Sequence, residues 1–94
     1  MKQLPKGRVR AGRDVVFREL GGEMVLLNLK TGVYFGLNET GTQMWTLLME
    51  LQEPARVVTA LEQEYAAGRT QLENDLCSLL TTLRDKGLLE VDES

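Results

Sequence analysis

This chain of 94 residues is 43% hydrophobic and 27% charged, the balance of one small globular domain, and its net charge is −3. It has no histidine and one cysteine, Cys77, which excludes an intramolecular disulfide and a Cys/His zinc cluster and removes the commonest general base. The first residues are polar and basic, and no apolar run reaches the ~20 residues that a membrane helix needs, so we expect a cytoplasmic protein without a membrane partner.

The charges are unevenly distributed along the chain. Residues 1–18 hold six Lys or Arg against Asp14 alone, whereas the remainder holds five basic and thirteen acidic residues. Because residues 1–12 contain one proline and two glycines and show little periodicity, we expect a flexible basic arm there and a single domain over residues 13–94. The arm is either solvated or in contact with an acidic partner. The acidic body argues against electrostatic capture of nucleic acid.

Three strands are expected in the first half of the chain, at residues 13–20, 23–29 and 33–37. Gly21-Gly22 between the first two is typical of a two-residue hairpin of type I′ or II′, and Gly32 supplies a positive φ in the second loop. Short turns force neighbouring strands to pair, so the sequence predicts an antiparallel meander with 23–29 in the centre.

Three helices are expected in the second half, at residues 39–51, 54–67 and 70–86. Asn38 is a good N-cap for the first, Gly68 is expected to end the second, and Thr70-Gln71-Leu72-Glu73 fits a capping box that starts the third. After Gly87, a short extended segment is expected to pack back on the core. The elements together predict an α+β, winged-helix-like fold, a three-stranded antiparallel meander followed by three helices.

The residue types argue against catalysis. Without histidine, neither Cys77 nor any Ser or Thr hydroxyl has a plausible base at helical or turn spacing. Cys77 lies on a leucine-rich helix, where a buried, inert thiol is expected. The glycines do not show the spacing that cradles phosphate. We therefore expect no catalytic residue, no metal and no cofactor, and interpret the chain as a binding protein.

The strand at 33–37 is the candidate binding element. It lies at an edge of the meander and carries no charge or proline that would block the addition of another strand. Either another part of the chain, the basic arm or the C-terminal segment, covers this edge, or it is open for a peptide to add as a fourth strand. Val33, Phe35 and Leu37 share the face expected to point at the helices, and Gly36 permits close approach of another backbone.

The third helix carries a leucine stripe that includes Leu76, Leu79, Leu80 and Leu83. The stripe is wide enough to be ordinary core. It also allows a second interpretation, in which a margin of leucines lines a groove beside the edge strand.

The chain resembles the PqqD-like proteins in three stretches, which are GEMVLLNLKTGVYFGLNETGTQMWTLL, a helix ending in Tyr65, and a leucine-rich helix ending in RDKGLLEV. This family comprises the peptide chaperone of pyrroloquinoline quinone biosynthesis and its relatives, which include the small leader-binding proteins of lasso-peptide pathways. The resemblance covers about residues 13–91. The run GVYFGLNETG is closer to the stand-alone relatives.

The resemblance implies a RiPP recognition element that binds the leader of a ribosomally made precursor peptide and presents it to a modifying enzyme or leader protease. In that family the leader adds to the third strand and lies against the third helix. Carried over to this sequence, the peptide-binding residues are Val33, Tyr34, Phe35, Gly36, Leu76, Leu79, Leu80 and Leu83. If Leu80 lines the groove, Leu80→Glu weakens binding more than about tenfold while the domain stays folded; lost folding would place it in the core.

Two alternatives remain open. A winged-helix nucleic-acid-binding protein needs basic residues along the outward face of its third helix, but here Arg84 and Lys86 lie only at the end, beside Asp85. A structural dimerisation domain would pair the open strand with its own copy across a two-fold axis. A homodimer of this kind is compatible with peptide binding if the peptide dissolves it.

Overall fold

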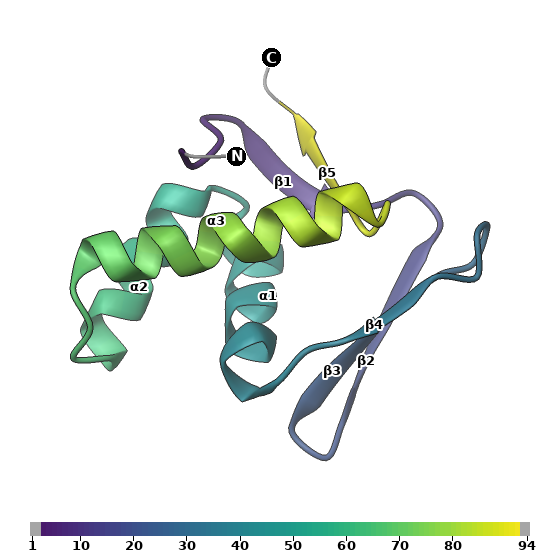
Figure 1. Cartoon of the computed structure of the whole chain (residues 1–94), viewed down its shortest axis with the longest axis horizontal. Coiled ribbons are helices and arrows are strands. Elements are labelled where there is room, and N and C mark those ends of the chain that lie inside the picture. Colours follow the sequence, from purple (N-terminus) through teal and green to yellow (C-terminus); the bar gives the residue numbers. More distant parts are fainter. Residues whose placement is uncertain (1–2, 93–94) are drawn as a thin grey trace.

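The computed structural model describes residues 3–92 and shows an α+β fold, as expected from the sequence (Figure 1). The elements are β1 (Arg8–Ala11), β2 (Val15–Leu20), β3 (Glu23–Asn28), β4 (Tyr34–Gly36), α1 (Glu39–Leu51), α2 (Pro54–Glu64), α3 (Arg69–Asp85) and β5 (Leu89–Asp92). Strands β2, β3 and β4 form one antiparallel sheet, and β1 pairs with β5 in a second. Residues 1–2 of the expected arm and 93–94 of the expected domain lie outside the described residues.

The meander forms where its turn residues predict it. Gly21 and Gly22 both have positive φ, 60° and 87°, which suits the two-residue turn between β2 and β3, and Gly32 has φ 78° in the next loop. Phe17, Leu26 and Phe35 lie opposite one another across the three strands. The central position of β3 is thereby confirmed, and β4 is left at an edge of the sheet.

Residues 8–11 correct the expectation of a flexible arm that extends to residue 12. They form β1, which pairs with β5 so that Arg8 lies opposite Asp92. The alternation in this segment sends Val9 into the core, where its side chain is fully buried, and its backbone N–H donates to the carbonyl of Gln52 at 2.8 Å. The domain therefore begins before residue 13, and the expected packing of the C-terminal segment on the core is confirmed.

The helix boundaries confirm one sequence signal and correct two others. The Asn38 side chain accepts from the Gly41 N–H at 2.8 Å, so Asn38 is the N-cap of α1. Helix α2 ends at Glu64 because Tyr65 turns into an extended conformation, packs on the core and donates its hydroxyl to the side chain of Gln43. Gly68 then serves as the N-cap of α3, and the expected capping box that starts at residue 70 does not form.

The core lies between the three helices and the inner face of β3. Trp45 of α1 is fully buried, and its ring meets the edge of Phe17 with 5.2 Å between ring centroids. Helix α3 buries its leucine stripe against α2 and the rest of the core. Along residues 3–92, no helix is long and apolar enough to cross a lipid bilayer.

Candidate functional site

The outer edge of β4 presents backbone groups that have no hydrogen-bond partner among residues 3–92. The Asn28 N–H donates to the Val33 carbonyl and the Leu37 N–H donates to the Met24 carbonyl, each at 2.8 Å, so Val33 and Leu37 direct their main chain at β3. Because these directions alternate along an antiparallel strand, Tyr34 and Gly36 point their N–H and C=O groups away from the sheet. No residue between 3 and 92 occupies this edge.

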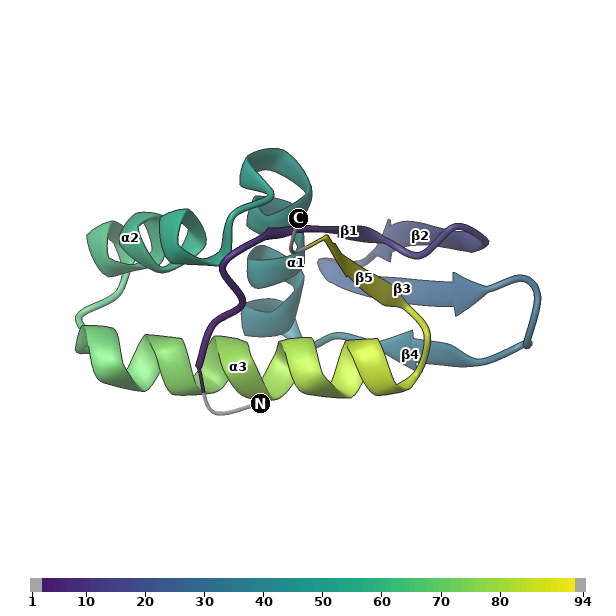
Figure 2. The ribbon, with the colours of Figure 1, turned by 90° about the horizontal axis from the view of Figure 1, so that it is seen from above.

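The face of the sheet beside this edge is also open. A Cβ built on Gly36 would meet no atom of the described chain within 4 Å apart from its own chain neighbours. The segments that we considered as covers, the N-terminal arm and the C-terminal segment, pair with each other as β1 and β5 instead. Figure 2 shows the meander in the order β2, β3, β4, with α3 on the side of the molecule where β4 lies.

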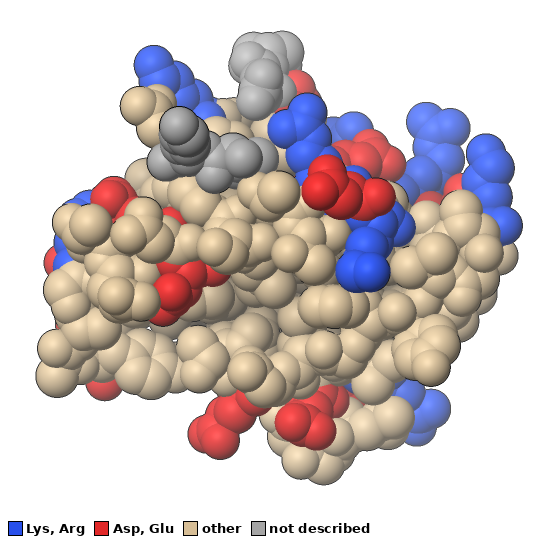
Figure 3. All heavy atoms as spheres, viewed as in Figure 1, with Lys and Arg blue, Asp and Glu red and all other residues tan. Residues whose placement is uncertain are grey.

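A groove of about 370 Å³ lies between β4, the start of α1 and α3. Its lining comprises Phe35, Asn38, Thr40, Gly41, Met44, Asp75, Ser78, Leu79 and Thr82. Phe35 and Leu79 are half-buried and supply apolar walls, whereas Asp75 is exposed and supplies a negative charge. The surface over β4 and the middle of α3 is largely uncharged, whereas charged side chains of both signs gather at the C-terminal end of α3 (Figure 3). This groove is suited to apolar side chains with a few polar contacts.

Two contacts fix the geometry of the groove. The Asn28 side-chain amide donates to the Gly87 carbonyl at 3.0 Å and accepts from the Lys30 and Thr31 N–H groups, so the end of α3 is attached to the β3–β4 loop. The Lys86 ammonium lies over the Phe35 ring, 5.5 Å from its centroid, in a cation–π contact. The Phe35 ring is therefore held at one end of the groove.

The structure places five of the eight expected residues at this site. Tyr34, Phe35 and Gly36 form the edge strand β4, Val33 directly precedes it, and Leu79 lines the groove. The other three, Leu76, Leu80 and Leu83, have no exposed surface and belong to the core. This corrects the expectation that they line the groove. Their stripe packs into the core, against α2 among other elements, and only its margin reaches the surface.

Sequence reasoning missed most of the polar lining of the groove. On α3 this polar lining consists of Asp75, Ser78 and Thr82, which lie along one side of the helix next to the leucine stripe. Their spacing of three and four residues places them on one helical face. This polar stripe was the signal that could have located the groove, because it runs parallel to the core stripe at a constant offset.

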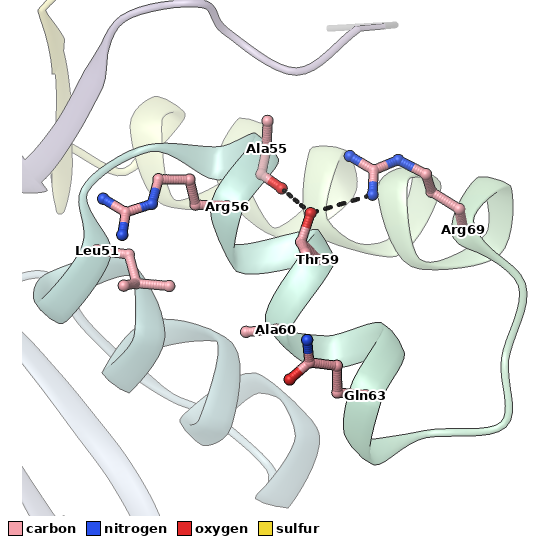
Figure 4. A pocket seen from close by; sticks show the side chains of 7 residues that line it. All are labelled: Leu51, Ala55, Arg56, Thr59, Ala60, Gln63 and Arg69. Atoms are coloured by element: carbon pink, nitrogen blue, oxygen red, sulfur yellow. Dashed lines mark hydrogen bonds between the residues drawn. The ribbon is translucent and has the colours of Figure 1, made fainter.

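A second hollow, of about 400 Å³, lies on the α2 side of the molecule, lined by Leu51, Ala55, Arg56, Thr59, Ala60, Gln63 and Arg69 (Figure 4). Arg69 is already held by Glu62 at 2.6 Å, by Glu73 at 3.3 Å and by the Thr59 hydroxyl at 3.2 Å. Its charge is therefore compensated within the chain, and the hollow brings together no acid, base and nucleophile.

The cysteine and the possible metal ligands were the remaining candidates for a reactive site among residues 3–92. Cys77 is buried, and this burial raises the pKa of its thiol above the ordinary value, so the nucleophilic thiolate is disfavoured at neutral pH. Within the part of the chain that the structure describes, no three His, Cys, Asp or Glu side chains gather as metal ligands would. What the fold does offer is an open strand edge with a groove beside it.

Comparison of the sequence with known protein families shows which family the chain belongs to. The sequence model of the family described as coenzyme PQQ synthesis protein D (PqqD) matches residues 23–89, which include the meander from β3 onward and all three helices. The chain therefore belongs to the PqqD family, and the resemblance found in the sequence is confirmed.

Two solved structures of proteins with bound leader peptides are similar to this chain. The structure of TbiB1 in complex with the TbiA(beta) leader peptide is 41% identical to this chain, with a TM-score of 0.82 over 86% of this chain and 94% of that one. Lasso peptide synthetase B1 complexed with the leader peptide is 30% identical, with a TM-score of 0.81 over 88% and 98%. A search of curated protein sequences gave no match.

Proposed function

We propose that this protein is a non-catalytic module that binds the leader of a ribosomally made precursor peptide and presents it to a modifying enzyme or leader protease. The observation that carries the proposal is the open edge of β4 beside an apolar groove. Two similar proteins, TbiB1 and a lasso peptide synthetase B1, have structures with leader peptides bound, which supports the same role here.

The edge determines how a peptide would bind. A strand that pairs with β4 would exchange hydrogen bonds with the outward N–H and C=O groups of Tyr34 and Gly36. Side chains alternate along a strand, so the peptide residue opposite Phe35 would point to the inner face of the sheet. There it would enter the groove and contact Phe35 and Leu79. The site therefore selects an extended peptide with apolar residues at every second position.

The energetics suit a reversible carrier. Four backbone hydrogen bonds contribute about 0.5–1.5 kcal/mol each, and one or two buried apolar side chains add about 1.5–3 kcal/mol each. Ordering a flexible peptide and the loss of its free motion offset much of this gain. The expected Kd lies between about 1 nM and 1 μM. Binding in this range holds the leader long enough for reaction and still permits release.

A nucleic-acid-binding role is not favoured. The face of α3 that borders the groove carries Asp75 and uncharged residues. The basic residues of α3 lie at its two ends, with Arg69 in ion pairs at the start and Arg84 in the last turn, and Lys86 just beyond the helix is engaged with Phe35. Nucleic acid would require a basic row along this face.

The test is a titration of the isotope-labelled protein with the leader of the precursor peptide encoded near its gene. We expect the amide resonances of Tyr34 and Gly36 and those of residues 75–82 to shift together, because one ligand occupies both the edge and the groove. A scrambled leader of the same composition is the control. Shifts confined to the N-terminal residues, or equal shifts with the scrambled peptide, would contradict the proposal.

A further inference from the structure

The buried polar side chains of this domain lie at the two ends of β4. Along residues 3–92 they are Asn28, which is 8% exposed, and Thr42, which is 7% exposed. Asn28 ends β3, just before the loop that leads to β4, and Thr42 lies near the start of α1, just after β4. A buried polar group costs free energy unless it is hydrogen-bonded, so the partners of these two side chains show what they hold in place.

The Thr42 hydroxyl holds the end of β4 where the chain leaves the sheet for α1 (Figure 1). It accepts from the Met24 N–H at 2.8 Å and donates to the Leu37 carbonyl at 3.3 Å. Met24 and Leu37 are buried, so both groups would lose their partner without this hydroxyl. The Thr42 backbone N–H donates to the Asn38 carbonyl at 2.8 Å within α1. Thr42 therefore attaches this end of the edge strand to the helix.

The Asn28 side chain holds the opposite end of β4. Its oxygen accepts from the N–H groups of Lys30 and Thr31, at 2.9 and 3.1 Å, which sets the shape of the β3–β4 loop. Its amide donates to the Gly87 carbonyl at 3.0 Å, just after α3. The Asn28 backbone N–H donates to the Val33 carbonyl at 2.8 Å, directly before β4. Asn28 therefore attaches the start of the edge strand to the end of α3.

Between these two attachments, β4 has few contacts of its own. It has three residues, of which Tyr34 is 73% exposed, Phe35 is half-buried and Gly36 has no side chain. Within the described residues its outer edge is unpaired, and a groove of about 370 Å³ lies between it and α3. A short strand that buries so little opens readily. A peptide that binds only the formed strand loses affinity in proportion to the fraction of molecules in which β4 is in place.

We propose that Thr42 and Asn28 are positioning residues for peptide capture, which hold β4 at a fixed spacing from α3 before the peptide arrives. This inference rests on the proposed function and adds the residues that set its affinity without touching the peptide. Neither residue lines the groove or belongs to β4, so each acts on binding through the strand that it attaches. A binding surface that is formed in advance does not have to be ordered when the peptide binds, which raises the affinity.

The test uses two variants that each remove one attachment. Thr42→Val removes the hydroxyl with little change in volume, and Asn28→Asp removes the donor to Gly87 while keeping the acceptor for the loop. Thr42→Ser keeps the hydroxyl and is the rescue variant. The control is Val58→Ala, which opens space in the core on α2 and lowers stability, although α2 does not line the groove.

Two quantities are measured for each variant, at a temperature where circular dichroism shows it to be folded. Calorimetry gives the affinity for the leader. Nuclear magnetic resonance gives the hydrogen-exchange rate of the Phe35 amide without peptide. Phe35 lies opposite Leu26 and its N–H points at β3, so this rate reports how often β4 opens.

We expect Thr42→Val and Asn28→Asp each to weaken leader binding by about five- to tenfold and to exchange the Phe35 amide faster than the unchanged protein. Thr42→Ser should bind within about twofold of the unchanged protein. Val58→Ala should also bind within about twofold, even if its melting temperature falls as far as that of Thr42→Val.

Binding within about twofold by either attachment variant would overturn the inference for that residue. So would weakened binding with an unchanged Phe35 exchange rate, or an equal loss of affinity in Val58→Ala. The unchanged protein supplies a check that does not depend on the variants folding. Its Met24 amide, which donates to Thr42, should be protected from exchange without peptide, and rapid exchange there would overturn the role of Thr42. If the unchanged protein does not bind the leader although this amide is protected, the proposed function is refuted instead.

Discussion

Gly36 offers a direct test of whether a peptide adds to β4. Its N–H points away from the sheet, so Gly36→Pro removes a donor that β3 does not use. Proline is tolerated at such positions on an edge strand. Its Cβ also has room at residue 36, since a Cβ built there meets nothing within 4 Å outside the two chain neighbours. The substitution therefore leaves the fold intact and blocks the hydrogen bond that an added strand would need.

The expected loss follows from the carbonyl that the peptide would leave unpaired. An unsatisfied buried acceptor costs about 1–3 kcal/mol, which corresponds to about a five- to 150-fold increase in Kd. The free energy of unfolding should stay the same or rise slightly, because proline restricts the unfolded chain. Calorimetric titration with the leader and a thermal melt measure the two quantities.

Glu19→Pro is the matched control. Glu19 lies on β2, at the opposite edge of the same sheet. The Leu29 N–H donates to the Asp14 carbonyl, and alternation along β2 from that bond leaves the main-chain groups of Glu19 pointing outward. Glu19→Pro should bind the leader within about twofold of the unchanged protein. The reasoning is refuted if Gly36→Pro binds as tightly as the unchanged protein, or if Glu19→Pro loses as much affinity.

Three further predictions concern side chains. Leu79→Glu should weaken leader binding by about tenfold or more, as measured by calorimetry, with the melting temperature nearly unchanged. Leu80→Glu should instead unfold the domain, because it places a charge in the core, and circular dichroism measures this loss. A folded Leu80→Glu variant would contradict the packing described above. Asn38→Ala should lower the free energy of unfolding by about 0.5–2 kcal/mol through loss of the N-cap, as measured by urea denaturation; an unchanged midpoint would show that the cap contributes nothing. The pKa of Glu90 is lowered by the Arg13 backbone N–H and then by the Arg10 side chain, so its stabilising contribution is full above its ordinary value of 4.5 and is lost as pH falls through the lowered folded-state pKa. Glu90→Gln should therefore be less stable than the unchanged protein at pH 7 and equal to it in strong acid, and a difference that persists in acid would show another cause.

The meander and the start of α1 were predictable because their signals are local. Positive φ at Gly21 and Gly22 and the capping side chain of Asn38 involve residues within a few positions of one another. Such chemistry is readable in any short stretch of sequence. The edge position of β4 follows from these turns, and so half of the candidate site could be located before the fold was known.

The parts that sequence reasoning missed depend on distant residues. Strand β1 pairs with β5, and the Arg10–Glu90 contact joins residues 80 positions apart, so no local pattern announced it. The end of α2 is set by Tyr65, which leaves the helix to reach the core and Gln43. The leucine stripe of α3 showed an amphipathic helix, but not which leucines would meet α2 and which would face a groove. Periodicity gives the faces of a helix without giving its neighbours.

The pairing of β1 with β5 has a practical consequence for engineering. Arg8 lies opposite Asp92, so β1 begins where β5 ends, and neither strand passes along β4. Residues 3 and 4, which precede β1, line a hollow together with Glu73 and Asn74 of α3. An enzyme fused after β5 would therefore start beside β1, whereas one fused ahead of residue 3 would start beside α3, so the linker length needed to reach the captured peptide depends on the terminus that is chosen.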